Sequence, residues 1–105
     1  MKLVLISNYG DESQIIADMA TKEIIHQIIN SLDWNDFYLL NLEKNDNDYI
    51  SVGGNLKDDG LSVFYQENND QYVIKDAPGT ITEMENILIS YLNQDDNWKN
   101  NNEWQ

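Results

Sequence analysis

The chain lacks cysteine and arginine, and it has one proline and one histidine among its 105 residues. Without cysteine, neither a disulfide nor a thiolate metal site can form. The single histidine, His26, has no second histidine or cysteine with which to share a metal ion or a proton, so we predict a structural or surface role for it. The sequence therefore predicts no metal site and no cofactor.

Long apolar runs are also missing. No stretch approaches the roughly 20 apolar residues that a membrane-spanning helix needs. The apolar start at Lys2–Ser7 is too short for a signal peptide. Together with the absence of cysteine, this pattern predicts a soluble, cytoplasmic protein with no membrane partner.

Negative charge is what the chain has in excess. It carries 19 acidic and 6 basic residues, all of the basic ones lysine, so its formal net charge is -13. Such a surface repels nucleic acid and attracts basic proteins. We therefore predict no nucleic-acid partner. The charge alone leaves open whether the acids serve a basic protein partner or only keep the chain soluble.

Short apolar segments separated by polar turns predict strands. The predicted strands are Lys2–Ser7, Phe37–Leu42, Tyr49–Val52, Leu61–Gln66 and Gln71–Lys75. Asp11–Met19 shows neither period clearly, and a helical turn is one interpretation of it. Gly53 and Gly54 are expected to end the third of these strands as turn formers. Because the later loops are short, neighbouring strands are expected to run antiparallel.

Two amphipathic helices are predicted, and each begins at a threonine. The apolar residues of Thr21–Leu32 recur at helical spacing, with Thr21 as the N-cap. The second helix begins with the capping box formed by Thr80 and Glu83 and runs to Asn93. Together with the strands, these helices predict a single-domain α+β fold. In it, an antiparallel meander sheet of about four to five strands packs with two amphipathic helices.

Alternation divides the side chains of the last three strands between two faces. We expect the helix-covered face to carry Ile50, Val52, Leu61, Val63, Tyr65 and Val73. The other face would then carry Tyr49, Phe64, Tyr72 and Ile74. Beyond the second helix, Trp98 and Trp104 stand in an otherwise polar tail. We expect both to dock on the body of the domain, because a solvated tail rarely carries tryptophan.

Two polar turns lack the residues that would make them ligand loops. Glu43–Asp48 alternates acids and amides, but the glycine and the glutamate that a calcium loop needs at its sixth and twelfth positions are missing. Asn55–Gly60 has no Gly-Lys-Ser/Thr ending, and its carboxylates would repel phosphate. Neither a calcium loop nor a phosphate loop is predicted.

The C-terminal half has a distinctive order of elements. A strand that ends in two glycines, ISVGG at 50–54, is followed by LSVFY at 61–65, YVIK at 72–75, TEMENILISYL at 82–92 and a near-terminal Trp104. This order resembles the Imm1-type immunity proteins of bacterial polymorphic toxin systems. The resemblance implies a cytoplasmic antidote that binds one cognate toxin domain, often a nuclease or a nucleic-acid deaminase, and blocks it.

The charge balance agrees with that implication, because toxins that act on nucleic acid need basic clefts. From charge and alternation, and not from the resemblance, we predict a partner-binding surface of loop acids and aromatic anchors. The acids are Asp46, Asp48, Asp58, Asp59, Glu67 and Asp70, and the anchors are Tyr49, Phe64 and Tyr72. A solvated acidic rim is the alternative interpretation of each of these acids.

An enzyme, another kind of acidic binding protein and a homodimer are the alternatives. An enzyme would need positioned carboxylates or a nucleophile motif, but nearly all the acids lie in predicted turns or helix starts, so we predict no enzyme. An acidic interaction or regulatory module without a toxin partner also fits the charge, as does a nucleic-acid mimic that binds many basic proteins. A homodimer formed through the second face of the sheet is the remaining alternative.

Overall fold

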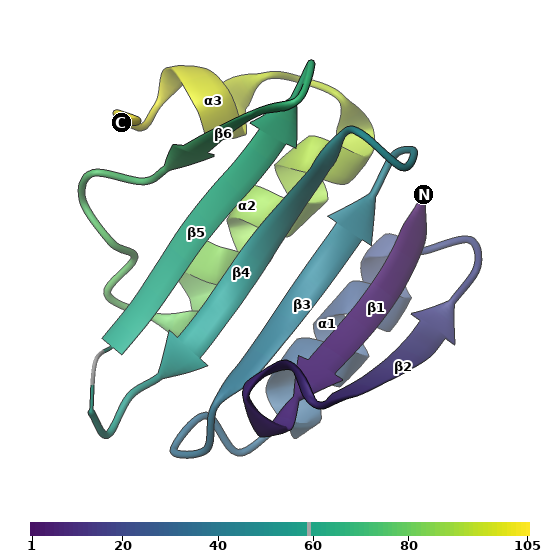
Figure 1. The fold of residues 1–105 in the computed structure, drawn as a ribbon, viewed down its shortest axis with the longest axis vertical. Helices are drawn as coiled ribbons and strands as arrows, with labels where there is room; N and C mark the ends of the chain where they lie inside the picture. The colour runs from purple at the N-terminus through teal and green to yellow at the C-terminus, as the bar shows by residue number, and fades with distance from the viewer. Residues whose placement is uncertain (59) are drawn as a thin grey trace.

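The protein is a single antiparallel sheet with helices on one of its faces. The computed structural model describes residues 1–58 and 60–105, and Asp59 lies outside them. The six strands follow the order β2-β1-β3-β4-β5-β6, and α1 and α2 cover one face (Figure 1). The strands are β1 (Lys2–Ser7), β2 (Glu12–Ala17), β3 (Tyr38–Glu43), β4 (Tyr49–Asn55), β5 (Gly60–Glu67) and β6 (Asp70–Val73). The helices are α1 (Lys22–Ser31), α2 (Ile81–Asn93) and the short α3 (Asn97–Asn100), and a 3-10 turn, η1, spans Asn8–Gly10.

The predicted α+β class, the antiparallel sheet and the two covering helices are confirmed, with more strands than expected. The additional strand is β2, and the helical-turn interpretation of this segment is wrong. Asn8, Tyr9 and Gly10 have φ values of 54°, 54° and 96° and reverse the chain, so that Ile15 pairs with Val4. Because β2 is an exposed edge strand, its sequence lacks the alternation of apolar and polar residues by which a half-buried strand is predicted.

Both helices begin as the sequence predicts. The Thr21 hydroxyl accepts a hydrogen bond from the Ile24 amide at 3.2 Å, and the Thr80 hydroxyl accepts one from the Glu83 amide at 3.1 Å. The Glu83 carboxylate reaches back to the Gly79 amide at 2.8 Å, one residue earlier than in the standard capping box. These caps fix the residues at which the two helices begin.

The core lies between the helices and the sheet. Its fully buried members include Ile25 and Ile29 from α1, Met84 and Leu88 from α2, and Leu3, Leu40, Leu42, Ile50, Val52 and Val63 from the strands. Burying one such side chain stabilises the fold by about 1.5–3 kcal/mol as an upper estimate. The buried isoleucines offset the poor helix propensity of β-branched residues in α1.

The two glycines of β4 do not end the strand, so their predicted role as turn formers is wrong. A Cβ atom on Gly53 would lie 2.1 Å from the carbonyl oxygen of Tyr38. Gly54 has a φ of 117°, and a Cβ atom there would lie 2.2 Å from the carbonyl oxygen of Gly60. Glycine is therefore required because the neighbouring strands approach closely, and β4 continues to Asn55.

The register of β6 corrects three predicted side-chain directions. Asn68 and Asn69, with φ values of 53° and 68°, form a two-residue loop that sets Tyr72 opposite Tyr65. Tyr72 therefore lies on the helix-covered side, with its ring stacked 4.9 Å from that of Tyr65. The assignments of Tyr72 and Ile74 to the other face, and of Val73 to the covered face, are wrong: Ile74 is buried and Val73 is 46% exposed.

The C-terminal tail docks on the domain, as its tryptophans predict. The backbones of Val73 and Gln105 exchange two hydrogen bonds of 2.9 Å, and Ile74 forms a bridge with Trp104. Trp98 is buried and packs edge-on against Tyr65, with 4.9 Å between ring centroids. The tail thus covers the β6 edge of the sheet, whereas β2 forms the other edge (Figure 1).

Candidate interaction surfaces

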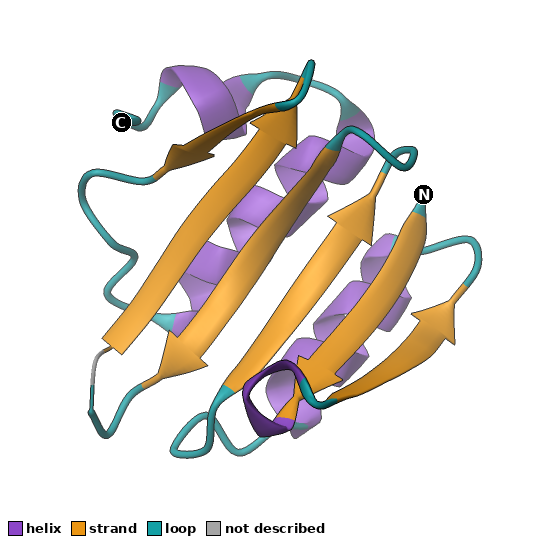
Figure 2. Cartoon of the chain, in the orientation of Figure 1, coloured by secondary structure: helices purple, strands orange, loops and turns teal. Residues whose placement is uncertain are grey.

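The face of the sheet opposite α1 and α2, here called the open face, has no α-helix over it in the described chain (Figure 2). Alternation from the core residues assigns its side chains. A central row crosses all six strands through Ile15, Val4, Asn41, Ser51, Phe64 and Val73. Beside this row, Ile6 and Leu39 extend the apolar surface.

The open face is nearly free of charge, although the chain is rich in it. Within the described strands, its charged side chains are Lys2 and Glu43, which pair with each other at 3.6 Å. Tyr49 and Phe64, two of the predicted anchors, lie here, with their rings edge to face at 6.2 Å. The Tyr49 hydroxyl accepts a hydrogen bond from Gln71 Nε2 at 3.2 Å. This face therefore offers apolar and aromatic contact area with little desolvation of charge.

Two polar atoms in the central row are buried without a partner. Within residues 1–58 and 60–105, neither Asn41 Oδ1 nor Ser51 Oγ makes a hydrogen bond. Asn41 and Ser51 face each other across β3 and β4, and Ser51 is fully buried by its neighbours. Buried polar atoms are normally satisfied, so leaving these two atoms unpaired lowers the stability of the fold.

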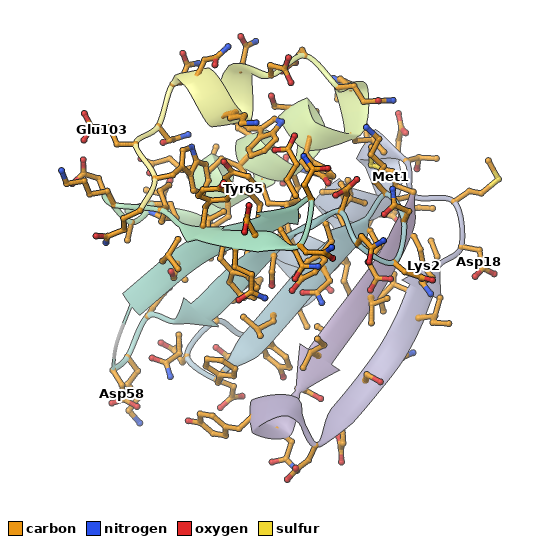
Figure 3. All side chains as sticks on the ribbon, turned by 45° about the horizontal axis from the view of Figure 1, so that its top comes forward. Met1, Lys2, Asp18, Asp58, Tyr65 and Glu103 are labelled. Carbon is orange, nitrogen blue, oxygen red and sulfur yellow. The ribbon has the colours of Figure 1, made fainter. Side chains whose placement is uncertain are left out.

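The predicted acids do not form one site, because the loops of a meander alternate between the two ends of a sheet. Asp46 and Asp48 precede β4, and Glu67 and Asp70 flank the β5–β6 loop, all at one end. Asp58 lies at the opposite end, far from Tyr65 and Met1 (Figure 3). Asp59 lies outside the described residues.

Asp48 and Glu67 already have partners within the chain. Asp48 accepts hydrogen bonds from the Asn68 amide at 3.2 Å and from Asn45 Nδ2 at 3.3 Å, which ties the two loops together. Glu67 Oε2 lies 2.7 Å from Lys99 Nζ. The hydrogen bond that Lys99 donates to Glu67 is the main cause that raises the pKa of Lys99 above its usual value. These two acids therefore hold the loops and the C-terminal tail together at this end of the sheet, and they also give it negative charge.

A cavity of about 290 Å³ opens between these loops and α3, and we call it the α3 cavity. Its lining combines the carboxylates of Asp48, Glu67 and Asp96 with the rings of Tyr65, Tyr91 and Trp98. Burial, reinforced by the charges of Asp48 and Glu67, raises the pKa of Tyr91 to about 12. The Tyr91 hydroxyl thus stays protonated at neutral pH beside two carboxylates.

The opposite end of the sheet carries a surface that the sequence did not reveal. Tyr9 is 75% exposed and stacks on Phe37, with 4.7 Å between ring centroids. A hollow of about 620 Å³ beside this pair is lined by Glu12, Asp36 and Asp58, among others. Positive φ values at the three residues of η1 place Tyr9 beside this hollow. The sequence signal for this turn was the glycine that follows an asparagine and a tyrosine.

Two other features, a metal-binding cluster and a membrane-spanning helix, are not found among the described residues. Residues 1–58 and 60–105 contain no group of three or more histidine, cysteine, aspartate or glutamate side chains that could hold a metal ion. No helix among them is long and apolar enough to cross a membrane. His26 is exposed and lies 3.0 Å from Glu85 Oε1, at the contact between α1 and α2.

Comparison with known proteins finds no match: no family model, no curated protein and no solved structure corresponds to this chain. The function therefore has to be inferred from the surfaces themselves.

Proposed function

We propose that the chain is an immunity protein that binds and neutralises one cognate toxin domain with a basic surface, in the cytoplasm of the cell that makes both. A nuclease or a nucleic-acid deaminase is the proposed class of toxin, because such enzymes need a basic cleft for their polyanionic substrate. In this proposal the chain acts by binding and not by catalysis.

The open face is the observation that carries the proposal. It has an uncharged centre with Phe64, Ile6 and Leu39, while acidic loops lie at both ends of the strands. Protein interfaces share this anatomy: an apolar core depleted of charge inside a polar rim. A chain of net charge -13 would bring a basic partner to this face quickly through electrostatic attraction.

The size of the face is also suitable. The molecule measures 30 × 29 × 24 Å, and the view down its shortest axis looks onto the sheet (Figure 1). A stable complex buries about 800 Å² on each partner. Most of the open face would have to be covered to reach that area, so the central row and its flanking apolar residues would all lie inside the interface.

The test is co-expression with the toxin domain that the neighbouring gene encodes. The wild-type chain should restore growth and bind the purified toxin with nanomolar affinity, which corresponds to about -12 kcal/mol. A neighbouring gene without a toxin-like domain, together with no toxin neutralised, contradicts the proposal.

Salt dependence separates this proposal from a general acidic module. A cognate complex that buries the open face should keep substantial affinity at high salt, because apolar burial is not screened. Weak binding to many basic proteins, abolished by salt, would instead favour the acidic interaction module or the nucleic-acid mimic.

A further inference from the structure

The α3 cavity already holds one cation, which belongs to the chain itself. The Lys99 ammonium group lies 2.7 Å from Glu67 Oε2 and 5.6 Å from the centroid of the Tyr65 ring. A carboxylate and an aromatic face thus stabilise a positive charge together at the mouth of this cavity. The chemistry of the lining suits a second cation of the same kind.

Two tyrosine hydroxyl groups of the cavity lining have no hydrogen-bond partner within the described chain. Tyr65 is 4% exposed and Tyr91 is 7% exposed, and both line the cavity. Within residues 1–58 and 60–105, neither hydroxyl makes a hydrogen bond. The negative charges of Asp48 and Glu67 act on the Tyr91 hydroxyl, and all three side chains line the same cavity. The two hydroxyl oxygens therefore offer unused acceptor lone pairs to a ligand.

One carboxylate of the cavity lining is also left without a close partner. The Asp96 carboxylate makes no hydrogen bond or ion pair within the described chain. Lys99 neutralises Glu67, and the lining also includes Lys44 and the N-terminal residue Met1 beside Asp48 and Asp96. Because the whole chain has a net charge of -13, the surrounding field favours a cation over an anion.

We propose that the α3 cavity is a pocket for one arginine side chain of the basic partner. The inference rests on the proposed function and names the group that the partner inserts. A volume of about 290 Å³ lies at the lower end of the range for ligand pockets, which suits one side chain. A guanidinium group matches the lining best, because its planar donors can bond a carboxylate and the two tyrosine hydroxyls at the same time.

The test uses three short blocked peptides and the whole chain without any toxin. The probes are Ac-Gly-Arg-Gly-amide, the same peptide with lysine, and the same peptide with citrulline, the neutral isostere of arginine. The readout is the NMR signal of the Trp98 indole during titration. The arginine peptide should shift it saturably, lysine should bind more weakly, and citrulline should cause no saturable shift.

Two variants leave the backbone and the packing in place. Asp96 has a φ of 62°, a conformation that asparagine adopts as readily as aspartate, so Asp96→Asn removes only charge. Tyr91→Phe removes one hydroxyl. Each should weaken the arginine peptide by about two- to tenfold. Asp18→Asn, on an exposed loop away from Tyr65, is the matched control and should leave the affinity unchanged (Figure 3).

Equal shifts with the arginine and citrulline peptides, or wild-type affinity in both variants, would overturn the arginine pocket. If the toxin is neutralised while these peptides fail to bind, the proposed function stands and the pocket proposal falls. If the arginine peptide binds at Trp98 but no toxin is neutralised, the cation pocket stands and the proposed function falls.

Discussion

Leu39 and Leu40 are neighbours in β3, yet they have different environments because they lie on opposite faces of the sheet. Leu40 is fully buried among the residues of α1, α2 and the sheet, whereas Leu39 is only partly buried on the open face. The same residue type therefore serves folding on one face and remains available for binding on the other. The comparison teaches that the chain closes one face with its own helices and leaves the second face without a covering helix.

The largest expected effect tests the two faces with one matched pair of substitutions. Leu40→Ala removes a fully buried side chain and should lower the free energy of unfolding by about 2–5 kcal/mol. Leu39→Ala should lower it by about 1 kcal/mol or less, because the side chain keeps part of its exposure in the folded state. Urea unfolding of both variants measures the difference. Equal losses would show that the open face contributes to the core as much as the covered one.

The second prediction concerns affinity for the partner. Here a substitution on the open face should have the larger effect, whereas the helix-covered face matters more for the free energy of unfolding. Phe64→Ala should weaken the toxin complex by about 2–4 kcal/mol, as expected for a central aromatic anchor. Isothermal titration calorimetry with the purified toxin domain measures it. Gln27→Ala, on the exposed side of α1, is the control and should bind like the wild type. If Phe64→Ala binds as tightly as the wild type, the open face is not the centre of the interface.

The third prediction concerns the pH dependence of stability that the Tyr91 hydroxyl, on the helix-covered side of the sheet, should produce. Its pKa is raised to about 12 in the folded state, above the unfolded value of 10.0. Between these values the unfolded chain loses the proton while the folded chain keeps it. The stabilisation is therefore complete below pH 10.0 and is lost as the pH rises toward about 12, by up to about 2–3 kcal/mol.

Urea unfolding at several pH values across that window measures this loss. Tyr91→Phe cannot ionise and should lose less stability over the same window than the wild type. Tyr9→Phe, at a ring that is 75% exposed, is the matched control. A wild-type slope in Tyr91→Phe would mean that the Tyr91 hydroxyl is not the group responsible.

The smallest expected effect concerns the hydroxyl of the open face. Ser51→Ala removes a buried hydroxyl without a partner, so it should raise the free energy of unfolding by about 1 kcal/mol. Thermal unfolding of the variant measures this gain. The substitution should not improve toxin binding, because the backbone and the neighbouring Phe64 stay in place. A loss of stability would mean that the hydroxyl is satisfied in solution.

Local signals in the sequence were enough for much of the fold. The N-caps at Thr21 and Thr80 and the apolar periods of their helices located α1 and α2 correctly. Alternation correctly assigned Ile50, Val52 and Val63 to the covered face. The two tryptophans of the tail were enough to predict that it docks. These features depend on interactions within a few residues, or on the need to bury a large apolar side chain.

What the sequence missed depends on register and on contacts between distant segments. The side of Tyr72 was decided by the two-residue loop at Asn68–Asn69, because a shift of one position moves a side chain to the other face. The requirement for Gly53 came from the carbonyl oxygen of Tyr38 on a neighbouring strand. Neither neighbour is visible in the local pattern of β4 or β6.

The candidate surfaces divide in the same way. Composition determined the charge, and with it a preference for a basic partner, because net charge is a sum over the sequence and needs no fold. Tertiary structure decided where that preference acts: the alternating loops separated Asp58 from Asp48, and the docked tail brought Trp98 to Tyr65 and Tyr91. Only the packing of both helices on a single face left the open face uncovered, since each helix stripe alone could have covered either side.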